Sequence, residues 1–91
     1  MNKTSQNHPP IAPLSDSLMA AYLDAARRFA ALLDFGTAAQ ILTAFRAALV
    51  AETDLLRHSG GVLELVAAEA LEHEIALVDR DLANRAGRLP N

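Results

Sequence analysis

Three acidic residues stand where the helical periodicity of the sequence predicts apolar side chains: Glu52, Glu74 and Asp81. A carboxylate held among apolar side chains can act as a general acid, bind a cation or accept a hydrogen bond from a buried donor. Its burial costs free energy unless a partner satisfies it. Function, or a specific structural contact, is therefore to be sought first at these three positions.

Glu52 has a structural partner within reach. If the helices on either side of Gly36 are antiparallel, Tyr22 lies at the level of Glu52. A hydrogen bond from the tyrosine hydroxyl to the carboxylate would then satisfy both groups. Alternatively, the Glu52 side chain reaches solvent at the domain edge, or it contacts a ligand or a second subunit. We expect Tyr22 and Glu52 to be a buried polar pair.

Glu74 and Asp81 lie seven residues apart on one side of a helix, with apolar rows on both sides of them. Arg46 is expected near the level of Glu74, and Arg85 follows Asp81 by four residues. An ion pair for each acid, formed between helices, would account for both. Alternatively, this helix presents one face to its own core and another to a partner, and the acids mark the boundary. Either way, Glu74 and Asp81 are expected to be buried polar groups.

Histidine close to carboxylates raises the question of a metal site, because His73 follows Glu69 by four residues. The helical di-metal motif needs a glutamate three residues before the histidine, and that position holds Ala70. Glu69 and His73, with Glu52, remain the candidates for a ligand- or metal-binding helical protein, but we expect no metal.

Cysteine, a Gly-rich phosphate loop and a nucleophile beside a base are all missing from the sequence. We therefore expect neither a cofactor nor an enzyme.

The composition is typical of a small helical domain. The 91 residues are 52% hydrophobic, but nineteen are alanines, which favour helix and add little to a core. The net charge is −3 without a basic stripe, so we expect no nucleic-acid binding. A signal peptide and a run of about eighteen uncharged apolar residues are both missing, which predicts a cytoplasmic protein outside the membrane. Seven arginines against one lysine suggest a bacterial source.

The chain is predicted to divide into a polar arm and one helical domain. Residues 1–14 are polar and contain three of the four prolines, so we expect a disordered N-terminal arm. Residues 15–89 are expected to form a single three-helix domain. Apolar residues recur with the helical period over 16–34, 38–58 and 62–86, which predicts a helix in each.

Cap and turn residues set the expected helix boundaries. Ser15 is expected to cap the first helix, and Gly36 to adopt a left-handed conformation after it. Thr37 and Gln40 have the spacing of a capping box, which predicts where the second helix begins. Ser59-Gly60-Gly61 is expected to end it.

Short turns make consecutive helices antiparallel. The expected fold class is therefore all-α, an antiparallel three-helix bundle that consists of a helical hairpin and a long third helix. The third helix has two apolar rows, of which the first is Leu63, Val66, Ala70 and Leu77. The second row has the four-three-four spacing of a coiled-coil seam and consists of Leu71, Ile75, Val78 and Leu82. We expect this second row to bind a partner helix or to form a homodimer.

These features favour a non-catalytic protein–protein interaction module, such as an adaptor, a chaperone or an accessory subunit of a larger enzyme. The thin, alanine-rich core would gain stability from self-association or from a protein partner. The stretch Leu49–Leu56, a glycine-containing break and the stretch Leu65–Glu69 together resemble the helical hairpins of flagellar and type III export chaperones. That resemblance covers under half of the chain and implies an apolar groove for the terminal helix of an export substrate.

Overall fold

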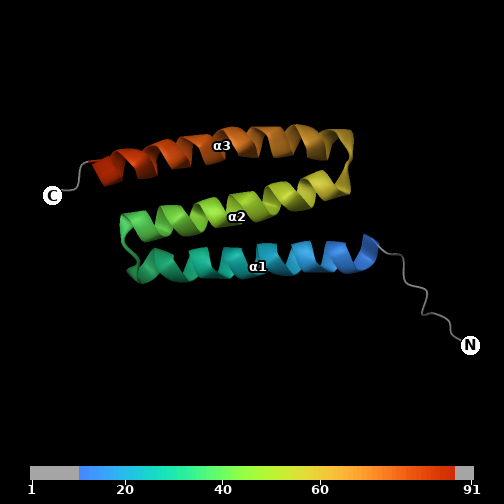
Figure 1. Ribbon diagram of the computed structural model, residues 1–91. Coiled ribbons are helices and arrows are strands. Elements are labelled where there is room, and N and C mark those ends of the chain that lie inside the picture. Colours follow the sequence, from blue (N-terminus) through green and yellow to red (C-terminus); the bar gives the residue numbers. More distant parts are fainter. Residues whose placement is uncertain (1–10, 88–91) are drawn as a thin grey trace, which may run out of the picture.

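A computed structural model describes residues 11–87, which form three helices joined by two turns of two residues each. The helices are α1 (Ile11–Phe35), α2 (Ala38–Ser59) and α3 (Val62–Gly87). Consecutive helices run antiparallel (Figure 1). The predicted all-α, three-helix fold class is confirmed, and the observed α2 and α3 each end one residue beyond the predicted range.

The turn between α1 and α2 is fixed by the predicted capping box. The Gln40 backbone N–H donates to the Thr37 hydroxyl at 3.1 Å, and the Thr37 backbone N–H donates to the Gln40 side-chain oxygen at 2.9 Å. Gly36 does not take the left-handed conformation that we expected. Its N–H donates to the Leu32 carbonyl at 2.7 Å, and a Cβ at Gly36 would meet that oxygen at 2.8 Å. Glycine is needed there because the backbone approaches closely, and not because φ is positive.

The left-handed glycine belongs to the second turn. Gly60 has φ 78° and ψ 0°, and its N–H donates to the Leu56 carbonyl at 3.2 Å. Glycine adopts this conformation without the steric cost that a Cβ would impose. Arg57 and His58 occupy the last turn of α2, where positive charge is favourable.

The start of α1 differs from the prediction. The helix begins at Ile11, so Ser15 lies inside it and is not its N-cap. Proline is tolerated in the first turn of a helix because the N–H that it lacks has no partner there anyway. Pro13 is the third residue of α1 and therefore does not end the helix. Residues 1–10 of the predicted arm, and residues 88 and 89 of the predicted domain, lie outside the described range.

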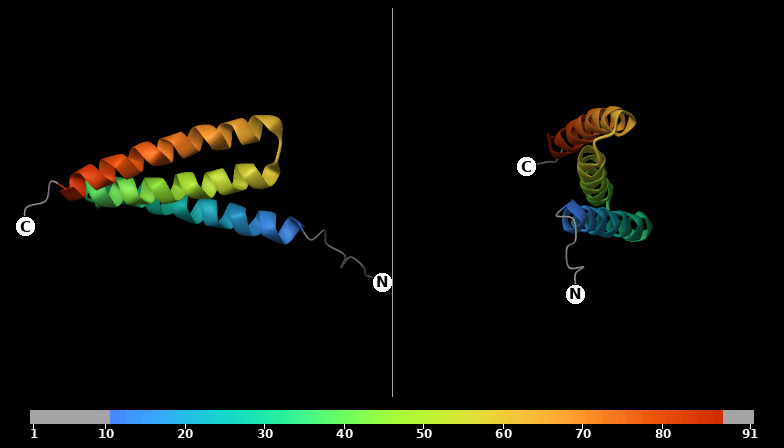
Figure 2. Two further views of the ribbon diagram at one scale, coloured as in Figure 1. Left: turned by 45° about the horizontal axis from the view of Figure 1, so that its top comes forward. Right: turned by 90° about the vertical axis from the view of Figure 1, so that its right-hand side faces the viewer.

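The three helices form an open layer with α2 in the middle. α1 and α3 each pack on α2, and within residues 11–87 no Cα of α1 comes within 8 Å of one in α3. Both views in Figure 2 place α2 between its neighbours. A layer of this kind has two broad faces, whereas a closed bundle would have brought α1 and α3 together.

The core is as thin as the alanine content predicts. Within residues 14–87, the buried side chains are Ala44, Leu49, Thr53, Ala68 and Val78. The Thr53 hydroxyl donates to the Leu49 carbonyl at 2.7 Å, so its burial leaves no unsatisfied donor. The rings of Phe29 and Phe45, with centroids 5.3 Å apart, are the main aromatic contact between α1 and α2.

Candidate interaction surface

Helical geometry gives the layer two open faces with different chemistry. At about 100° per residue, two sides of α2 lie between the directions of α1 and α3: Arg46 and Arg57 mark one side, and Phe45 and Glu52 mark the other. The first side, here the charged face, also contains Asp24, Arg28, Asp54, Glu72 and Asp79. The second side, here the apolar face, contains Met19, Leu23, Leu33, Ile41, Phe45, Leu56, Leu63 and Leu77.

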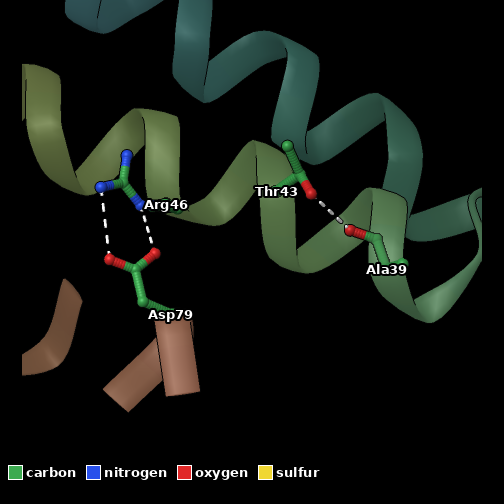
Figure 3. A network of polar contacts seen from close by, with 4 residues as sticks. All are labelled: Ala39, Thr43, Arg46 and Asp79. Atoms are coloured by element: carbon green, nitrogen blue, oxygen red, sulfur yellow. Dashed lines mark hydrogen bonds and ion pairs between the residues drawn. The ribbon is translucent and has the colours of Figure 1, made fainter. Parts of the chain in front are cut away.

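Two ion pairs on the charged face join α2 to α3. Arg46 Nε donates to Asp79 Oδ1 at 2.5 Å, and a second guanidinium nitrogen of Arg46 reaches Asp79 Oδ2 at 3.3 Å (Figure 3). Arg57 approaches Glu72 at 2.5 Å. The hydrogen bond from Arg46 to the Asp79 carboxylate raises the pKa of this guanidinium above its ordinary value. All four side chains are roughly half exposed, so each pair contributes at most about 1 kcal/mol and serves mainly to fix the register of the two helices.

Small side chains leave shallow hollows between α1 and α2 on the charged face. Arg28 lies at the rim of two of them. Their floor is made largely of alanine, namely Ala21, Ala25, Ala44 and Ala47. Alanine fills little of the space between two helices, which accounts for these hollows. A third hollow lies at the C-terminal end of α2, beside His58. The Nε2 atom of His58 is buried without a hydrogen-bond partner in the described part of the chain.

The apolar face exposes large hydrophobic side chains from the outer helices. On α3, Leu63 is 80% exposed and Leu77 is 53% exposed. On α1, Leu33, Met19 and Leu23 are 56%, 44% and 43% exposed. Single exposed leucines are ordinary on protein surfaces, but several exposed on one side of a helix layer are typical of a binding site.

The three acidic residues that the sequence singled out share this apolar face. Glu52 lies about 120° around α2 from Arg46 and about 140° from Arg57, and Glu74 and Asp81 lie on the corresponding side of α3. Glu52 and Asp81 are partly buried, and Glu74 is exposed. Because the face they share is open, these carboxylates lie at a surface and not in a closed core.

The contacts expected for these acids are only partly present. Among residues 11–87, no hydrogen bond joins Tyr22 to Glu52, although both are partly buried. Asp81 pairs with Arg85 at 3.2 Å, as its spacing predicts, but this contact lies within α3 and does not join two helices. Arg46 pairs with Asp79 and not with Glu74.

The row expected to bind a partner occupies a different place. Val78 is 5% exposed, and the rest of the row (Leu71, Ile75 and Leu82) is partly buried. Since α3 packs only on α2 within the described residues, this row forms the contact between the two helices. The four-three-four spacing identified a helix-packing seam, but the partner helix is α2 of the same chain. The first row of α3, which begins at Leu63, is exposed and is therefore available to another molecule. Its spacing was visible in the sequence.

The candidate metal ligands do not converge. Glu69 and His73 are exposed on α3. Across residues 11–87, no group of three or more histidine, aspartate or glutamate side chains is placed to hold a metal ion. Likewise, none of the three helices, over their described lengths, combines the length and apolar character needed to cross a membrane.

No protein-family model matches this chain, and neither a curated protein nor a solved structure is significantly similar to it. Function is therefore inferred from the surface chemistry of the layer.

Proposed function

We propose that this chain is a non-catalytic protein–protein interaction module that binds a partner through the apolar face of its helix layer. The single observation that carries the proposal is the exposure of this face. Leu33, Leu63 and Leu77 are each more than half exposed, while no large side chain in the described range is fully buried. Covering such side chains gains about 25 cal/mol for each Å² removed from water, so a partner on this face would supply the apolar burial that the core lacks.

The size of the face is adequate for a specific complex. Helices of 22 to 26 residues are about 33–39 Å long at 1.5 Å per residue. Three of them, about 9 Å apart, present a face of about 1000 Å². A standard interface takes about 800 Å² from each partner. The face is thus large enough for a stable complex without any change in the helix layer.

The proposal is tested by native mass spectrometry of the tagged chain, purified gently from its own cells. We expect a complex of fixed stoichiometry, either with another protein or with a second copy. Leu77→Asp, on the apolar face, should abolish this complex because it places a charge in the interface. Leu65→Asp is the matched control, since Leu65 is 42% exposed on the charged side of α3. A monomer with nothing bound, or a complex that survives Leu77→Asp, would contradict the proposal.

A further inference from the structure

The two ion pairs between α2 and α3 also place Glu52 and Glu74 relative to each other. On α2, Glu52 lies about halfway between Arg46 and Arg57, and on α3 Glu74 lies between Glu72 and Asp79. The two glutamates therefore stand at about the same height on neighbouring antiparallel helices. Both lie on the apolar face, with large hydrophobic side chains above and below them.

The arginines of α2 do not neutralise these acids. Arg46 and Arg57 lie on the charged face and are paired there. Arg85, toward the C-terminal end of α3, is paired with Asp81. Neither Glu52 nor Glu74 makes an ion pair with any residue in the range 11–87. Two like charges thus stand side by side on a surface that a partner would remove from water.

A partner that covers this surface must compensate the charges of Glu52 and Glu74. A carboxylate that loses its water without gaining a cation or a hydrogen-bond donor is strongly destabilised, and two adjacent carboxylates repel each other as well. A purely apolar partner would bury both groups uncompensated. An arginine or lysine on the partner would instead form charge-assisted hydrogen bonds with both.

We infer that the occupant of the apolar face is an amphipathic helix of another protein whose apolar side contains an arginine or lysine that bridges Glu52 and Glu74. This inference rests on the proposed function and adds the chemistry of the partner. The leucines of the face supply the apolar contact, and the two carboxylates select a helix by the cation within its apolar side.

A second copy of the chain fits this face less well. The area would suffice, but the described part of the second copy brings the same carboxylates, and its Arg46, Arg57 and Arg85 are already paired. A dimer that keeps these pairs would bury two copies each of Glu52 and Glu74 without opposite charge from those arginines. Electrostatics, and not area, therefore distinguishes the two occupants.

The test is a selection from a library of helical peptides, each about 18 residues long so that the helix spans the width of the layer. Positions on the apolar side of each peptide vary among leucine, alanine, glutamine, glutamate and arginine. The full chain is the target, and the best binder is then compared with its arginine-to-glutamine form by fluorescence anisotropy. Sedimentation of the chain alone measures self-association at the same concentrations.

Two variants of the chain complete the design. The double variant Glu52→Gln/Glu74→Gln removes the proposed site, whereas Asp54→Asn/Glu69→Gln removes the same charge away from the apolar face. We expect selected peptides to contain a central arginine that contributes about tenfold or more to affinity. This preference should vanish in Glu52→Gln/Glu74→Gln, persist in Asp54→Asn/Glu69→Gln and weaken in high salt.

The contrary results separate the two proposals. Peptides selected without arginine, or an arginine preference that survives Glu52→Gln/Glu74→Gln, would overturn the inference and leave the interaction module in place. Self-association that is lost in Leu77→Asp, with no peptide bound, would make a second copy the occupant and would overturn the inference alone. A monomer that binds no peptide of the library would overturn both.

Discussion

Replacing Leu63 and Leu77 together by glutamine should weaken binding while leaving the fold intact. Full burial of a leucine side chain contributes about 1.5–3 kcal/mol. With exposed fractions of 80% and 53%, covering Leu63 and Leu77 contributes about 1.2–2.4 and about 0.8–1.6 kcal/mol. The double variant should therefore bind the selected arginine peptide about 30- to 800-fold more weakly. Glutamine favours helix about as well as leucine, so the free energy of unfolding should change by less than about 1 kcal/mol in total.

Two measurements and one control make this prediction strict. Anisotropy titration with the peptide gives the affinity, and urea unfolding followed by circular dichroism gives the stability. The control is the Leu14→Gln/Leu65→Gln variant, whose leucines are 51% and 42% exposed on the charged side of the layer. This variant should bind like the parent chain. If Leu63→Gln/Leu77→Gln is folded and also binds like the parent, the apolar face is not the binding surface.

Further predictions concern the fold, each measured by urea unfolding. Val78→Ala should cost about 1–3 kcal/mol because Val78 is 5% exposed between α2 and α3; a cost near zero would mean that this contact is not formed in solution. Thr37→Ala removes the side-chain acceptor of the capping box and should cost about 1 kcal/mol, and Thr37→Ser should restore most of it. Gly60→Ala should cost about 1–2 kcal/mol because φ is 78°; a neutral result would argue against the left-handed turn. Asp79→Asn should cost less than about 1 kcal/mol because its pair with Arg46 is exposed, and a larger loss would indicate burial of this pair.

The helix boundaries could be predicted where a local signal decides them. Thr37 with Gln40 determines the start of α2, since both hydrogen bonds of the capping box lie within four residues. The start of α1 could not be predicted from the prolines of residues 1–14, because Pro13 stands in the first turn of the helix, where a proline costs no hydrogen bond. At Gly36 the residue type was informative, but the sequence does not distinguish a positive φ from a close backbone approach.

The arrangement of the helices was harder to predict than their extents. Helical periodicity identifies the apolar side of each helix, but it does not say which other helix packs on that side. The row containing Val78 could have met a partner or α2, and the choice depends on whether α1 and α3 meet. The same uncertainty affected Glu52, which lies in the apolar arc of α2 in either arrangement. Its arc is buried in a closed bundle and open in the layer.

The order of the helices in the layer has a consequence for folding kinetics. Every packing contact within residues 11–87 joins helices that are consecutive in the chain, across turns of only two residues. Such a topology has low contact order and is typical of chains that fold in microseconds to milliseconds. α2 belongs to both hairpins, so a destabilising change in α2 should slow the assembly of both. A change in α1 can leave the α2–α3 hairpin free to form first, before the chain presents its complete apolar face.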